Sequence, residues 1–168
     1  MILKYSKVRD GVFTPIRANP SDAGLDLRYS PDTSKLGDYD KLGNFIDIEG
    51  RLQISSGASV LIPTGIKLEI PHGYCFEIKN RSGNAAKKQL IVGACVVDSG
   101  YDGEVFINLH NVGSEDQHVM AWDKIAQVVL VPVVHFRALE TNGDLYEWYP
   151  ITISNRGDGA LGSTDDKQ

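Results

Sequence analysis

The chain has 168 residues and a formal net charge of −5 at pH 7, and this length corresponds to one domain with an ordinary hydrophobic core. The acidic balance argues against direct nucleic-acid binding over a broad surface, so an anionic ligand requires local arginines or a divalent cation. Because no apolar stretch is long enough to span a membrane and the first residues lack a signal-peptide pattern, we expect a cytoplasmic protein with no membrane partner.

The N-terminal third contains one isolated acid and one long polar segment. Ala23-Gly24-Leu25-Asp26-Leu27 places the acid between apolar neighbours, where its carboxylate can face the water shell of a metal ion. The segment of about residues 33–51 is rich in Gly, Asp, Lys and Tyr. We interpret it as a surface excursion, which loop-closure entropy tolerates. The alternative is a surface for a protein partner, anchored by Tyr39, Phe45 and Ile46.

Three segments in the middle of the chain alternate apolar and polar residues with the period of a strand. They are residues 66–70, 74–78 and 105–109, and turn signals lie at 63–65, 71–73 and 100–103. Each segment is expected to bury one face. The pattern predicts an all-β barrel or double-sheet roll.

A single short helix is predicted between these strands, at residues 82–88, with Ser82 as its cap. Arg81-Ser82-Gly83 at its start combines a guanidinium, a hydroxyl and backbone N–H groups, which suits an anion. An ordinary capped helix with a surface arginine explains the same residues. No P-loop sequence occurs in the chain.

Asp98 ends an apolar strand beside a tight turn, where partial burial can hold it as a general base. An aspartate at a turn is also a common local acceptor for backbone N–H groups. Cys75 and Cys95 lack partners at metal or redox spacing, so we expect both to be buried small hydrophobes in a reducing compartment. Residues 128–134 are apolar on both faces, which predicts a buried strand with a bend or bulge at Pro132.

The last predicted element is a polar, glycine-dense tail from Arg156 to Asp165. Little apolar area offsets the entropy that its glycines lose on ordering, so we expect it to close only on a ligand. Its guanidinium, hydroxyls and backbone N–H groups suit phosphate oxygens, and a disordered terminus is the alternative. Gly157, Gly159 and Gly162 match a dinucleotide fingerprint formally, but that fingerprint requires a following helix.

Five segments in order resemble the five motifs of the homotrimeric dUTPases. They are Ala23-Gly24-Leu25-Asp26-Leu27, Arg81-Ser82-Gly83, residues 92–101, Lys124-Ile125-Ala126-Gln127 and residues 156–164. The resemblance implies a β jelly roll, also called a β-clip barrel, with one short helix and a mobile C-terminal arm. It assigns residues 1–152 to the jelly-roll domain, with an insertion at about 33–51, and residues 153–168 to an arm that closes an active site.

The resemblance also implies that the protein is a homotrimer that uses Mg²⁺ to hydrolyse dUTP to dUMP and pyrophosphate. This activity keeps uracil out of DNA and supplies dUMP for thymidylate synthesis. Asp98 matches the residue that activates the attacking water, and Asp26 matches the one that supports the magnesium through water. Phosphoryl transfer asks the protein mainly for positioning and charge neutralisation. The residues that match the family's substrate contacts are Arg81, Ser82, Gly83, Val92, Gly93, Val97, Tyr101, Gln127, Arg156, Leu161, Gly162, Ser163 and Thr164.

Individual matches carry more specific expectations. A hairpin around residues 92–97 is expected to pair with the uracil edge, and the Tyr101 ring to exclude a 2′-hydroxyl. Leu161 stands where the family usually has an aromatic residue over the uracil, and Cys95 replaces a usual glycine. Two other interpretations stay open: an enzyme like the dCTP deaminases, which share this fold, and a non-catalytic regulatory protein gated by dUTP.

Overall fold

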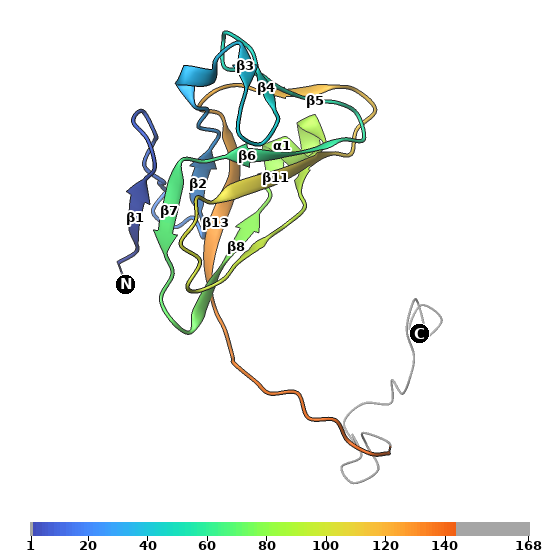
Figure 1. Cartoon of the computed structure of the whole chain (residues 1–168). Helices are drawn as coiled ribbons and strands as arrows, with labels where there is room; N and C mark the ends of the chain where they lie inside the picture. The colour runs from blue at the N-terminus through green and yellow to red at the C-terminus, as the bar shows by residue number, and fades with distance from the viewer. Residues whose placement is uncertain (1, 144–168) are drawn as a thin grey trace. The chain divides into compact units, whose positions relative to one another are not determined.

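The computed structural model describes residues 2–143. The chain divides into two units, residues 1–134 and 135–168, and the first contains every described helix and strand (Figure 1). The predicted boundary at 152/153 and the site candidates Arg156, Leu161, Gly162, Ser163 and Thr164 lie outside the described residues. None of the helices within residues 2–143 combines the length and the apolar character that crossing a membrane requires.

Antiparallel pairing organises the first unit into several small sheets. The largest has the order β10-β8-β13-β2, and the next has the order β6-β11-β9. Their strands are β2 Leu25–Arg28, β6 Ser59–Pro63, β8 Tyr74–Lys79, β9 Leu90–Val92, β10 Val96–Val97, β11 Phe106–Asn111 and β13 Lys124–Pro132. Three two-stranded pairs complete the fold: β1 Lys4–Lys7 with β7 Ile66–Glu69, β12 Gln117–Val119 with β5 Leu52–Ile54, and β3 Asp38–Tyr39 with β4 Phe45–Ile46.

One core joins these sheets. Several strands bury alternate residues in it, as in β11, where Ile107, Leu109 and Asn111 are buried and their neighbours are half-buried. Burial of such side chains supplies most of the favourable free energy of folding. Tyr29 is completely buried in the same core, and this burial, with the nearby charges of Asp40 and Asp47, raises the pKa of its hydroxyl far above the ordinary value.

The strand and helix predictions are largely confirmed. The alternating segments form β7, β8 and β11, and the helix α1 spans Ser82–Lys88. The three predicted turns separate strands, and Gly65, Gly73 and Gly100 adopt positive φ in them. The predicted cap is wrong in detail: Arg81 occupies the N-cap position and makes no side-chain capping bond.

The predicted strand at residues 128–134 is present in part, but its burial and its bend or bulge at Pro132 are wrong. Strand β13 begins earlier, at Lys124, ends at Pro132, and leaves Val129, Leu130 and Val131 half-buried. Its irregularity lies between Lys124 and Ala126, where the pairing with β2 shifts register. Pro132 ends the strand, a position at which its missing N–H interrupts no ladder.

The cysteines and the 33–51 segment also differ from expectation. Cys75 is only half-buried and Cys95 is exposed, because Cys95 lies in the connection between strands of two different sheets. Within the 33–51 segment, a 3-10 turn at Thr33–Lys35 precedes the β3–β4 pair. Ile46 is completely buried, so it belongs to the core and is wrong as a candidate anchor for a partner. Tyr39 and Phe45 are exposed, and their rings pack edge to face with centroids 5.4 Å apart.

Candidate active site

Three segments distant in sequence meet where β13 lies between β2 and β8. Gln127 of β13 pairs with Asp26 on one side and with Lys79 on the other, and the chain leaves β8 directly into Arg81, Ser82 and Gly83. A cavity of about 220 Å³ opens there, which we call the Asp26 cavity. Its lining is Ala18, Asp22, Gly24, Asp26, Arg81, Ser82, Gly83 and Gln127. The fold therefore brings five of the predicted site residues together.

Charged side chains of both signs gather at this cavity. The Asp26 side chain is only 12% exposed, and its two oxygens bind the Arg81 Nε at 3.0 Å and the Lys124 Nζ at 2.6 Å. Arg81 also donates to the Lys124 carbonyl at 3.2 Å, which fixes the guanidinium against β13. Because Asp22 also lines the cavity, two carboxylates balance these two cations, and an anionic ligand here requires directed hydrogen-bond donors and a divalent cation.

Close backbone approach holds Gln127 in place. A Cβ at Gly24 would lie 2.7 Å from the Gln127 Oε1 and 3.2 Å from the Val128 carbonyl, so a side chain at position 24 would displace the glutamine. The Gln127 Nε2 donates to the Asn80 carbonyl at 3.0 Å. The Asn80 side chain in turn accepts from the Val92 N–H at 2.6 Å. Asn80 was not among the predicted residues, and its place directly before Arg81 is the one sequence signal for it.

A second cavity, of about 490 Å³, contains the predicted catalytic residue and is called the Asp98 cavity. Its lining is Leu61, Val96, Val97, Asp98, Tyr101, Val105 and Phe106. The Asp98 carbonyl accepts from the Tyr101 N–H at 3.2 Å, which closes the turn after β10. Asp98 is exposed in the single chain. The expected partial burial of its carboxylate is therefore wrong for this chain alone, because the turn lies at the end of β10 with no further strand over it.

Tyr101 is held on the same turn by its own hydroxyl. The hydroxyl donates to the Glu104 carbonyl at 2.9 Å, and a Cβ at Gly103 would lie 2.2 Å from that hydroxyl. Position 103 must therefore be a glycine if the ring is to lie across the turn. Glu104 itself was not predicted from the sequence, and its side chain is buried.

The segment of residues 92–97 connects two sheets. Its flanking strands do not pair with each other: β9 pairs with β11, and β10 pairs with β8, so the expected hairpin is wrong in its hydrogen bonding. The expected tight backbone at Gly93 is confirmed. Its N–H donates to the Asn108 carbonyl at 3.0 Å, and an added Cβ would lie 2.2 Å from the His110 Nε2 and 2.3 Å from the Asn108 Oδ1.

The two cavities share no lining residue. Val97 pairs with Phe76 and Val96 with Glu77, so the chain runs toward the start of β8 as it reaches Asp98. Arg81 follows the opposite end of β8. With a rise of about 3.3 Å per residue along a strand, Asp98 and Arg81 of one chain lie on the order of 15–20 Å apart. One chain therefore holds the predicted site residues Asp26 and Asp98 in two separate cavities.

Residues 2–143 contain no group of three or more His, Cys, Asp or Glu side chains arranged to hold a metal ion. Asp22 and Asp26 both line the Asp26 cavity, and the Asp26 oxygens are already engaged by Arg81 and Lys124. This arrangement fits a hydrated Mg²⁺ whose direct ligands include oxygens of a bound phosphate chain, since Mg²⁺ retains several waters in such sites.

Comparison with known proteins yields one family. The dUTPase family model matches residues 46–164, which include four of the five segments identified in the sequence. The deoxyuridine 5′-triphosphate nucleotidohydrolase of Anaplasma marginale is 34% identical over 160 residues, with 92% of this chain and 90% of that protein covered. The corresponding protein of Clostridium acetobutylicum is 35% identical over 164 residues, with 96% and 95% covered. Both alignments are long enough to extend beyond the region of the family model.

Solved structures show the same fold at lower identity. A dUTPase mutant of Staphylococcus bacteriophage 80alpha with dUpNHpp has a TM-score of 0.74 at 19% identity and covers 97% of this chain and 98% of that one. A dUTPase mutant from phage phi11 of S. aureus, whose structure describes the coordination of a structural Mg(II) ion in that protein, has a TM-score of 0.69 at 19% identity, with 86% and 99% covered. The predicted all-β jelly roll is confirmed.

Proposed function

This chain belongs to the dUTPase family, and we propose that it hydrolyses dUTP to dUMP and pyrophosphate in sites that two or more subunits of a homotrimer build together. The observation that carries the proposal is the Asp26 cavity. It gathers an arginine, a hydroxyl, an amide and two carboxylates from three separate segments. This set of groups suits a triphosphate that carries a metal ion.

The Asp26 cavity binds the phosphate chain in this proposal. Arg81 neutralises phosphate charge from a position fixed by Asp26 and by the Lys124 carbonyl. Ser82 and Gly83 are exposed on the cavity wall and donate from the hydroxyl and the backbone. The Gln127 amide is oriented by the Asn80 carbonyl. Positioning and charge neutralisation of this kind are the main demands of phosphoryl transfer.

Asp98 acts as the general base. It accepts a proton from the water that attacks the α-phosphorus, and for this its carboxylate must lie within hydrogen-bond reach of that water. The hydrogen bond from the Tyr101 N–H to the Asp98 carbonyl closes a turn that fixes the backbone of Asp98. Exposure of Asp98 in the single chain leaves the carboxylate open to a substrate held by another subunit.

The separation of the half-sites supports assembly from different subunits. Arg81 and Asp98 must act on the same phosphate chain, yet within one chain they lie on the order of 15–20 Å apart by strand geometry. Apolar side chains at the Asp98 cavity are open to solvent in the single chain: Val96 is 57% exposed and Leu61 is 38% exposed. Packing of a second subunit against this cavity brings its Asp26 cavity to Asp98 and covers these side chains.

Base and sugar recognition belongs to the Asp98 half-site. Val92, Gly93 and Val97 present backbone groups toward the uracil edge, and the crowding of Gly93 against Asn108 and His110 keeps this backbone rigid. Cytosine offers a donor where uracil offers an acceptor, so it leaves buried groups unpaired at a cost of about 1–3 kcal/mol each. Tyr101 packs beneath the deoxyribose and excludes a 2′-hydroxyl.

Magnesium and the C-terminal arm complete the site in this proposal. When bound, Mg²⁺ neutralises charge that develops on the phosphate oxygens, and Asp26 holds one of its waters. Arg156, Ser163 and Thr164 of the arm cover the terminal phosphate, while Leu161 and Gly162 lie over the base. These assignments rest on the resemblance of residues 156–164 to the family motif.

The experiment that tests the function is pyrophosphate release by the purified protein with Mg²⁺, with dUTP, dCTP, dTTP and UTP compared at equal concentration. The expected result is release from dUTP that far exceeds release from the other three. Equal rates with dUTP and dTTP would contradict the proposed base recognition, and no release from any nucleotide would contradict the hydrolase function.

A further inference from the structure

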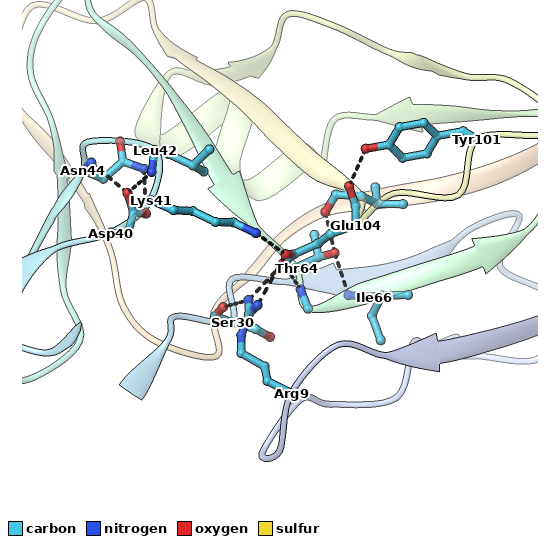
Figure 2. A network of polar contacts seen from close by, with 12 residues as sticks. Arg9, Ser30, Asp40, Lys41, Leu42, Asn44, Thr64, Ile66, Tyr101 and Glu104 are labelled. Carbon is cyan, nitrogen blue, oxygen red and sulfur yellow. Dashed lines mark hydrogen bonds and ion pairs between the residues drawn. The ribbon is translucent and has the colours of Figure 1, made fainter. Parts of the chain in front are cut away.

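A buried carboxylate beside the Asp98 cavity receives a cation from the 33–51 segment. Glu104 is the only charged residue among the described residues that is classed as buried. Its oxygens bind Arg9 at 2.9 Å, the Gly65 N–H at 2.7 Å and the Lys41 Nζ at 3.2 Å (Figure 2). The same residue accepts the Tyr101 hydroxyl through its backbone carbonyl. Glu104 thus connects Lys41 to the ring that faces the sugar.

Lys41 lies in a tight turn whose shape is set locally. The Asp40 carboxylate accepts from the Leu42 N–H at 2.8 Å, the Asn44 N–H at 2.9 Å and the Asn44 side chain at 3.0 Å. These bonds leave the turn few alternative conformations. The lysine side chain therefore leaves a defined backbone and extends to Glu104 (Figure 2).

The same turn contacts the wall of the Asp98 cavity at two further points. The Lys41 ammonium lies 5.1 Å from the centroid of the Phe106 ring, a cation–π distance. The Asn44 side chain donates to the Leu61 carbonyl at 2.9 Å. Leu61 and Phe106 both line the cavity. The turn thus contacts two cavity walls and, through Glu104, the tyrosine between them.

We propose that Lys41 is a positioning residue for the nucleoside half-site: by holding Glu104 and the Phe106 ring, it fixes Tyr101 at the place where it excludes a 2′-hydroxyl. This inference rests on the proposed function, and it gives the 33–51 segment a role inside the molecule. Among the residues that line the cavity, the Lys41 ammonium contacts Phe106. Lys41 therefore acts on Tyr101 through Glu104 and the Phe106 ring.

A positioning role and a merely structural role for Lys41 predict different effects on the stability of the protein and on its substrate specificity. The Lys41 side chain is 66% exposed although Glu104 is 5% exposed, so solvent screens the lysine charge and its removal is expected to change the free energy of unfolding only slightly. Arg9 remains on Glu104 when Lys41 is replaced. Lys41→Met is therefore expected to fold with nearly unchanged Tm, while the position of Tyr101 changes.

The test compares the wild type with Lys41→Met, Lys41→Arg and Lys35→Met by steady-state kinetics on dUTP and UTP. Lys35 is a matched control, because it lies in the same segment and pairs only loosely with the exposed Asp38, at 3.7 Å. Lys41→Met is expected to lower the ratio of kcat/KM for dUTP over UTP by about tenfold, since small misplacements of positioning groups have effects of this size or more. KM for dUTP is expected to rise more than kcat falls. Lys41→Arg restores the ratio, and Lys35→Met leaves it unchanged.

Binding of the non-hydrolysable dUpNHpp, measured by calorimetry on the same four proteins, distinguishes a failure of the Lys41 proposal from a failure of the proposed function. Absence of pyrophosphate release by the wild type contradicts the proposed function. A wild-type dUTP/UTP ratio and a wild-type Kd in folded Lys41→Met contradict the role of Lys41. An equal loss in Lys35→Met also overturns it, because the effect then belongs to the whole segment.

Discussion

The Asp26 carboxylate lies 2.6 Å from the Lys124 ammonium, and Arg81 binds its other oxygen at 3.0 Å. Replacement of Asp26 by asparagine leaves two cations without their acceptor, and we expect the free energy of unfolding to fall by about 1–3 kcal/mol. The Mg²⁺ concentration for half-maximal activity should rise, because the carboxylate that faces the hydrated ion is lost. Urea denaturation and a magnesium titration measure the two effects, and an unchanged magnesium requirement would contradict the assigned role of Asp26.

Asp98→Asn is expected to reduce turnover at least about a hundredfold, because the change removes the base and preserves the side-chain shape. Binding of dUpNHpp should stay within a few-fold of the wild type. Asp102→Asn serves as the control, since Asp102 is a 95% exposed carboxylate that pairs with Lys67 on the surface. Equal kcat in Asp98→Asn and the wild type would remove Asp98 from the mechanism.

Mixed oligomers test whether the half-sites come from different subunits. Arg81→Ala and Asp98→Asn should each be nearly inactive alone. If the two proteins are unfolded together and refolded, sites that combine an intact Asp26 cavity with an intact Asp98 form again, and pyrophosphate release should return. Because Arg81 and Asp98 lie at opposite ends of β8 in one chain, a mixture as inactive as its components would show that each site is built within one subunit.

Gly93→Ala is expected to weaken dUTP binding about tenfold and to destabilise the fold by about 1–3 kcal/mol, the usual range for overpacking. The added methyl would lie 2.2 Å from the His110 Nε2 and must displace either that ring or the backbone of residues 92–97. The Asn108 Oδ1 would lie 2.3 Å from the same methyl, so two further substitutions, His110→Ala and Asn108→Ala, are needed to open the space. If the triple variant recovers neither stability nor KM, contact with these two side chains is not the cause.

Deletion of every residue after Asn155 tests the arm. The truncated protein is expected to fold with the Tm of the full chain, because residues 1–134 contain all the described strands. Its hydrolysis of dUTP should be severely reduced, since Arg156, Ser163 and Thr164 are lost. Full activity after truncation would show that these residues do not cover the terminal phosphate.

Local signals in the sequence were sufficient for much of the fold. The helix Ser82–Lys88 and the strands that begin at Ile66 and Tyr74 appear at their predicted positions, because periodicity and turn residues act over a few neighbours. The errors occur where burial depends on distant segments. Ile46 is buried although its segment is polar, and Cys95 is exposed although cysteine is usually buried.

The sequence by itself determined the family, because five segments match its motifs in order, and it predicted phosphate contacts at Asp26, Arg81 and Gln127. Only the tertiary structure decided that these three meet in one cavity while Asp98 lies in another, and that Lys41 reaches Glu104. The register of β8 against β10 and β13 sets these distances. Pairing between strands far apart in the chain depends on the packing of the whole core, which no local pattern of residues contains.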